Sequence, residues 1–172
     1  MRAHSQGLLR ILMIEDQVPH ILENLPPRTT DIVKPWAERL PDHPALVDAS
    51  GTWTYAQLAS AIAETQVWLR ELGVRPGDRV MLVCENCRPF AVNFLALAAI
   101  DAWPVLVNAR LSPNEVDQIR DHCGARRVIY TVSVSPHAMK HAKRHGANFQ
   151  DFLDYGNSRI YQEEHHQSQR FF

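Results

Sequence analysis

The chain has 172 residues, of which 45% are hydrophobic and 22% charged, so it can bury a core and is neither collagen-like nor disordered in composition. Eighteen basic and nineteen acidic side chains leave a net charge of −1, which excludes a global positive field that would attract nucleic acid or an anionic membrane. Three cysteines, an odd number, argue against a secreted disulfide scaffold and favour a reducing, cytoplasmic location.

Residues 1–30 form an N-terminal leader segment. The apolar run over residues 8–14 is interrupted by Arg10, and Glu15 and Asp16 follow it where a signal peptide would carry small residues, so no signal peptide is predicted. No stretch reaches the roughly 18 uninterrupted apolar residues of a membrane-spanning helix, and no membrane span is expected.

A short helix, a hairpin and a long helix are predicted next. Asp31 is placed to cap a helix over residues 32–40 that has Ile32, Trp36 and Leu40 on one face. The hairpin joins two short extended runs across a turn at Gly51.

The long helix begins at a capping box. Thr54 and Gln57, three residues apart, can each bond a free backbone N–H of the other. Leu58, Ile62, Leu69 and Leu72 give the helix its apolar stripe, and Gly73 is placed to end it.

Strand and helix patterns then alternate. Strands are predicted over residues 79–84, 104–107 and 128–132, and helices over residues 89–101, 113–123 and 136–145. Ser112 and Glu115 form a second capping box at the start of the middle helix. The alternation predicts an α/β fold: a partial open, mostly parallel sheet with flanking helices in the order βαβαβ.

Residues 147–172 differ from the rest of the chain. Aromatic residues are scattered there among Gln, Glu and His without a sustained helical or strand period. We expect a poorly ordered tail.

Two patterns suggest thiol or metal chemistry. Cys84 and Cys87 have CxxC spacing, which suits a redox pair or half of a zinc site, but no second CxxC supplies the remaining ligands, so we favour incidental cysteines. His137, His141 and His145 recur every fourth residue among Lys and Arg, which favours a solvated helix face over a metal site. No metal ligands are predicted.

Phosphate-binding motifs are absent from the sequence. The seven glycines form neither GxGxxG nor GxxxxGK, and no GxSxG or HExxH occurs. The residues alone therefore predict an α/β layer without an evident active site.

Several segments together carry a resemblance. Residues 36–47 (WAERLPDHPALV), 52–58 (TWTYAQL), 72–80 (LGVRPGDRV) and 105–112 (VLVNARLS) stand in the order and spacing found in the N-terminal segment of the AMP-forming acyl-CoA synthetases of the adenylate-forming superfamily. The similarity runs over residues 31–146, which we therefore expect to be an incomplete AMP-dependent synthetase/ligase N-terminal subdomain, whereas residues 147–172 show no such match.

The resemblance implies an acid–CoA ligase that uses ATP, Mg²⁺ and coenzyme A. Such enzymes join a fatty or aryl acid to AMP, release pyrophosphate and pass the acyl group to coenzyme A. The family's phosphate loop ending in Pro-Lys-Gly, its ribose-binding Asp and its catalytic Lys have no counterpart in this sequence. No catalytic residue is assigned for that reason.

One binding residue can be carried over. Arg110, in the stretch Asn108-Ala109-Arg110-Leu111, matches an arginine that can lie near the nucleotide phosphate of coenzyme A in such ligases, and a guanidinium can fork onto phosphate oxygens. A surface arginine at a strand end remains the alternative. Asp101 departs from the family, which has a small Gly-Ala pair there.

Three hypotheses follow. The leading one is an N-terminal fragment of an acid–CoA ligase of fatty or aryl acid metabolism that is inactive alone, left by a truncated or shifted reading frame. The second is a stand-alone interaction module that self-associates through an exposed sheet edge. The third is a small CxxC redox or metal protein.

Overall fold

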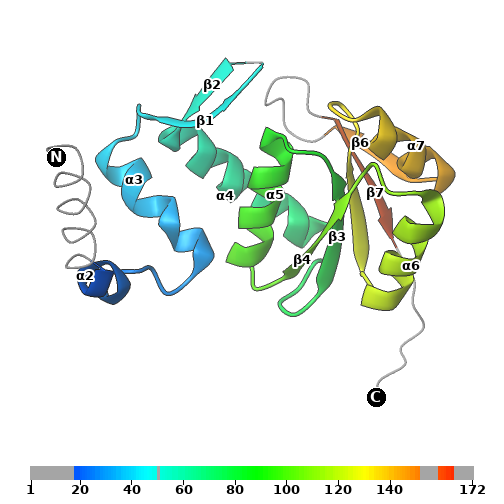
Figure 1. The fold of residues 1–172 in the computed structure, drawn as a ribbon, viewed down its shortest axis with the longest axis horizontal. Helices are drawn as coiled ribbons and strands as arrows, with labels where there is room; N and C mark the ends of the chain where they lie inside the picture. Colours follow the sequence, from blue (N-terminus) through cyan, green and yellow to red (C-terminus); the bar gives the residue numbers. More distant parts are fainter. Residues whose placement is uncertain (1–17, 50, 152–158, 165–172) are drawn as a thin grey trace, which may run out of the picture.

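A computed structural model describes residues 18–49, 51–151 and 159–164 (Figure 1). The helices are α2 (Val18–Glu23), η1 (Thr29–Ile32), α3 (Lys34–Arg39), α4 (Tyr55–Glu71), α5 (Arg88–Ala99), α6 (Pro113–Cys123) and α7 (Pro136–Arg144). The strands are β1 (Pro44–Asp48), β2 (Gly51–Thr54), β3 (Arg79–Cys84), β4 (Trp103–Asn108), β5 (Arg127–Thr131), β6 (Asn148–Asp151) and β7 (Arg159–Glu164). The apolar run over residues 8–14 lies outside the described residues.

The main sheet has five strands in the order β4-β3-β5-β7-β6. β3 pairs in parallel with both β4 and β5, which confirms the predicted mostly parallel α/β core. β7 then pairs antiparallel with β5, and β6 with β7. These two strands lie in the segment that was expected to be a poorly ordered tail. The sequence of β7 (RIYQEE) has no alternating apolar pattern, and the strand is placed by its pairing with β5 on one side and β6 on the other.

Two hydrophobic cores lie on opposite faces of β3. Val80, Leu82 and Cys84 belong to the core shared with α4 and α5, whereas Met81 and Val83 belong to the core shared with α6 and α7. Figure 1 shows the same division, with α4 and α5 on one side of the sheet and α6 and α7 on the other. The strand is therefore apolar at successive positions because both of its faces are covered.

Arg88 attaches the β1–β2 hairpin to the start of α5. Its Nη2 donates to Asp48 Oδ1 at 2.7 Å and to the Gly51 carbonyl at 2.6 Å. The guanidinium also lies over the ring of Trp53, 5.0 Å from its centroid. Since the side chain of Arg88 is only 10% exposed, these partners offset part of the loss of its hydration, while its buried Nε has no hydrogen-bond partner among the described residues.

Both predicted capping boxes are present. The Thr54 amide donates to Gln57 Oε1 at 2.8 Å, and the Gln57 amide donates to the Thr54 hydroxyl at 3.3 Å. Ser112 and Glu115 make the corresponding pair at 2.8 and 3.4 Å. The boxes fix where α4 and α6 begin, and hence how the helices meet the sheet.

The predicted cap at Asp31 is wrong. Asp31 lies within η1, and α3 begins after Val33 without any side-chain cap, with a proline in its first turn. Pro35 has a fixed φ suited to that turn, so it marks the start of the helix better than the polar residue does. Ile32, Trp36 and Leu40, predicted to share one face of the helix, are 43 to 49% exposed.

The histidine row is not the solvated face that was predicted. Only His137 is exposed; His141 is buried and the side chain of His145 is 5% exposed. Asp117, which α6 brings to this side of α7, accepts from His145 Nε2 at 2.8 Å and from both terminal nitrogens of Arg144 at 2.6 and 2.9 Å. The Tyr130 hydroxyl bonds His145 Nδ1. The spacing of the three histidines could not reveal Asp117 as a partner, because Asp117 lies on another helix.

Asp101 joins α5 to β4 with a left-handed backbone. Its φ is +59°, the only positive value at a non-glycine among the described residues. Its neighbours Ile100 and Ala102 are buried, and its own side chain forms an exposed ion pair with Arg28 at 2.8 Å. The departure from the family's small residue therefore leaves the junction packed but places a Cβ where glycine is favoured.

Replacing Asp101 by glycine should raise the free energy of unfolding by about 0.5 kcal/mol, because glycine adopts this φ without steric cost. Asp101→Ala should lower the free energy of unfolding. Arg28→Ala measures the contribution of the ion pair alone. Urea unfolding of the three variants is the measurement. A glycine variant less stable than Arg28→Ala would contradict the expectation.

Asp117→Asn should lower the free energy of unfolding by about 1–2 kcal/mol at neutral pH. Arg144 foremost, and His145 with it, lower the pKa of the Asp117 carboxyl from 3.8 to about 2, against the opposing effect of burial. A depressed carboxyl pKa stabilises the fold above the unfolded value, so the difference between wild type and variant should shrink as the pH falls from about 4 towards 2. Urea unfolding across this range measures it. Asp121→Asn on the same helix is the control, and an equal effect there would count against the network.

Candidate functional site

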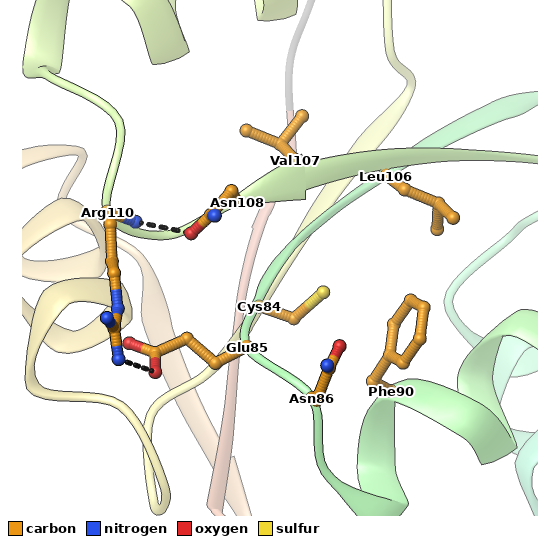
Figure 2. Close-up of a pocket in the computed structure, with 8 residues that line it drawn as sticks. All are labelled: Cys84, Glu85, Asn86, Phe90, Leu106, Val107, Asn108 and Arg110. Carbon is orange, nitrogen blue, oxygen red and sulfur yellow. Dashed lines mark hydrogen bonds and ion pairs between the residues drawn. The ribbon is translucent and has the colours of Figure 1, made fainter.

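A cavity opens at the carboxyl ends of β3 and β4 (Figure 2). Its volume is about 460 Å³, and it is lined by Cys84, Glu85, Asn86, Phe90, Leu106, Val107, Asn108 and Arg110. Cys84 and Asn108 are register partners in the parallel pair, so the loops that follow both strands leave the sheet at the same edge. Ligands of open parallel sheets bind at this edge.

An ion pair forms the polar end of the cavity. Arg110 Nη2 lies 3.0 Å from Glu85 Oε2, with the Arg110 side chain 69% and the Glu85 side chain 24% exposed. The Ser135 hydroxyl donates to the other carboxylate oxygen of Glu85 at 2.9 Å. The hydrogen bonds from Arg110 and then from Ser135 lower the pKa of Glu85, so this carboxylate is charged at neutral pH.

The loop that carries Arg110 is fixed on both sides. The Arg110 amide donates to Asn108 Oδ1 at 2.9 Å, and the Ala109 amide donates to the Cys84 carbonyl at 3.0 Å. His141 Nε2 lies 3.2 Å from the carbonyl oxygens of both Ala109 and Leu111. Since both partners are acceptors, the ring nitrogen donates, and α7 thereby holds the backbone around Arg110.

The other end of the cavity is apolar. Phe90, from the first turn of α5, and Leu106, from β4, lie close to Cys84 in Figure 2, and the Asn86 amide lies beside the Phe90 ring. Leu106 is 49% exposed. A bound molecule would therefore meet a cation at one end and apolar carbon at the other.

The cysteines do not have the properties of a reactive pair. Burial, with a smaller contribution from Cys87, raises the pKa of Cys84 to about 12, and burial also raises the pKa of Cys87. Thiols that attack disulfides or bind metals need a depressed pKa. Among residues 18–49, 51–151 and 159–164, no group of three His, Cys, Asp or Glu side chains could hold a metal ion.

Sequence reasoning singled out Arg110 but not the residues that hold it. The structure places Arg110 on the cavity rim, beside Glu85 and Asn108. Ser135 was not singled out, since it only precedes the helix predicted over residues 136–145, and His141 was considered only as one of three histidines in a row. Position directly after a buried parallel strand is the one signal that could have marked Glu85 in advance.

No helix in the described part of the chain is both long enough and apolar enough to span a bilayer.

Several curated relatives are CoA ligases of carboxylic acids. The chain is 35% identical over 88 residues to 4-coumarate–CoA ligase 3 of Oryza sativa subsp. japonica, a match that covers 50% of this chain and 16% of that enzyme. A long-chain-fatty-acid–CoA ligase of Mycobacterium tuberculosis is 35% identical over 83 residues, covering 48% of this chain and 16% of the relative. The chain thus matches about a sixth of the length of either relative.

Solved structures share the fold. A benzoate CoA ligase from Burkholderia xenovorans aligns with a TM-score of 0.61 and 25% identity over 68% of this chain and 23% of that one. The N-terminal domain of FACL13 from Mycobacterium tuberculosis aligns with a TM-score of 0.57 and 30% identity over 59% of this chain and 26% of that one. A family model described as AMP-binding enzyme matches residues 33–169, most of the chain, and the chain therefore belongs to the AMP-binding enzyme family.

Proposed function

We propose that this chain is an N-terminal fragment of an ATP-dependent, AMP-forming acid–CoA ligase that does not activate an acid by itself. The family match over residues 33–169 carries the proposal. Aryl and fatty acid ligases among the relatives support a fatty or aryl acid as the substrate class and a place in the metabolism of such acids. The odd number of cysteines, which argues against a secreted disulfide scaffold, supports a cytoplasmic location.

The proposed inactivity rests on electrostatics. Adenylation requires groups that neutralise the triphosphate as charge moves onto the leaving pyrophosphate. The sequence has no Gly-rich phosphate loop, and the family's ribose-binding Asp and catalytic Lys have no counterpart in it. We accordingly assign residues 31–146 to an incomplete subdomain. The expected boundary at residue 146 is not kept, because β6 and β7 extend its sheet and the family match continues to residue 169.

Arg110 is the proposed contact for coenzyme A. Its guanidinium is 69% exposed at the cavity rim, while His141 and Asn108 fix the surrounding backbone. A rigid loop that presents an accessible guanidinium suits a phosphate group, since a planar fork can donate to two oxygens at once.

A second candidate function is self-association through β4. This strand is at the edge of the sheet, and Trp103 and Leu106 on it are 67% and 49% exposed. An unpaired edge with exposed apolar side chains can pair with a second copy of the chain. Sedimentation over a range of concentrations tests this candidate: dimer formation that Leu106→Lys abolishes supports it, and a monomer throughout contradicts it.

The purified chain should release no AMP when mixed with ATP, Mg²⁺, coenzyme A and benzoate or a long-chain fatty acid. A full-length ligase of the same family is the positive control. Arg110→Gln is assayed in parallel, because turnover unaffected by this change points to a contaminating ligase. Acid-dependent AMP release that Arg110→Gln weakens would overturn the proposed inactivity.

Arg110→Gln should weaken coenzyme A binding by about tenfold, because a charge-assisted hydrogen bond to phosphate is lost. Binding of dephospho-coenzyme A, which lacks the nucleotide 3′-phosphate, should not change. Arg70→Gln, at the exposed end of α4, is the charge-matched control and should bind as wild type does. Calorimetric titration measures all three proteins, and equal affinities would exclude Arg110 as the contact.

A further inference from the structure

Glu85 already binds the guanidinium of Arg110, the group that a phosphate would need. Its Oε2 lies 3.0 Å from Arg110 Nη2 at the cavity's polar end, where both side chains point toward one another (Figure 2). A carboxylate at this distance satisfies part of the guanidinium and lowers the local potential for any other anion. An anion that binds Arg110 therefore meets a competitor that belongs to the protein.

The competitor is held in place independently of Arg110. Glu85 Oε1 accepts from the Ser135 hydroxyl at 2.9 Å, and that hydroxyl oxygen in turn accepts from the Ala138 amide at 3.1 Å in the first turn of α7. Ser135 is fully buried, so this anchor is shielded from solvent. The carboxylate consequently stays beside the cavity when the exposed, flexible arginine turns toward a ligand.

We propose that Glu85 is a positioning residue that holds Arg110 at the cavity and competes with the phosphate of coenzyme A for its guanidinium. This inference rests on the proposed function of Arg110. The pair keeps the arginine in a defined direction in the empty site, at the cost of affinity once the phosphate arrives. Glu85 thus sets how tightly the site holds coenzyme A, and favours release over retention.

The test uses the whole chain and four proteins: wild type, Glu85→Gln, Arg110→Gln and the double variant. Glu85→Gln should bind coenzyme A about three- to tenfold more tightly than wild type, because one negative charge beside the guanidinium is removed. Its affinity for dephospho-coenzyme A should not change. In the Arg110→Gln background the same change should have no effect, since the competitor acts through Arg110.

Glu71→Gln is the control for net charge. Glu71 ends α4 and is exposed. The carbonyl of the adjacent Leu72 accepts from Arg127 at the start of β5. Glu71 therefore lies near the amino ends of the parallel strands, whereas Arg110 lies at their carboxyl ends. This variant should bind as wild type does. A gain in affinity also separates the proposal from a merely structural role, because damage to the site would weaken binding.

The outcomes separate the two proposals. If Arg110→Gln weakens coenzyme A binding while Glu85→Gln leaves it unchanged or weakens it, the role of Glu85 is overturned and that of Arg110 stands. If Arg110→Gln has no effect, the proposed coenzyme A contact fails, and the competition fails with it. A gain with Glu71→Gln equal to that with Glu85→Gln would reduce the effect to net charge and overturn the inference.

Discussion

The burial of β3 on both faces is the constraint on which the rest of the structure depends. Alternate side chains of this strand enter two different cores, so each position from Val80 to Cys84 must be apolar, and helices must cover both sides. The polar groups of the strand are satisfied by parallel partners at its two edges. Polar side chains can therefore follow only after the end of the strand, where Glu85 lines the cavity.

Elements defined by local rules could be predicted from the sequence. The capping boxes at Thr54 and Ser112, the apolar run of β3 and the glycine after α4 each act within a few residues, and the structure has them where they were expected. Asp31 failed because Pro35 provides a stronger start signal nearby. β6 and β7 were missed because they are placed by pairing, β7 with the edge of β5 and β6 with β7, and not by their own pattern.

The candidate site could be predicted only in part, since its contacts join residues that are distant in sequence. Arg110 was singled out through a resemblance of its local motif. Glu85 and Ser135 are 50 residues apart, and His141 reaches back 30 or more residues to the carbonyls that flank Arg110. The periodicity of apolar residues along the sequence cannot reveal such contacts. The same holds for Asp117, whose partners lie on a different helix and turn an apparently solvated histidine row into a buried network.

The order of the strands also has a consequence for how the chain is made. β3 is the first strand of the main sheet to emerge from the ribosome, and its partners β4 and β5 follow it by about two and four dozen residues. Until they arrive, five consecutive apolar side chains from Val80 onward lack their sheet neighbours. Parallel pairing of this kind is slow and leaves such segments open to aggregation. Synthesis in the cell would therefore expose a natural binding segment for chaperones before the sheet closes.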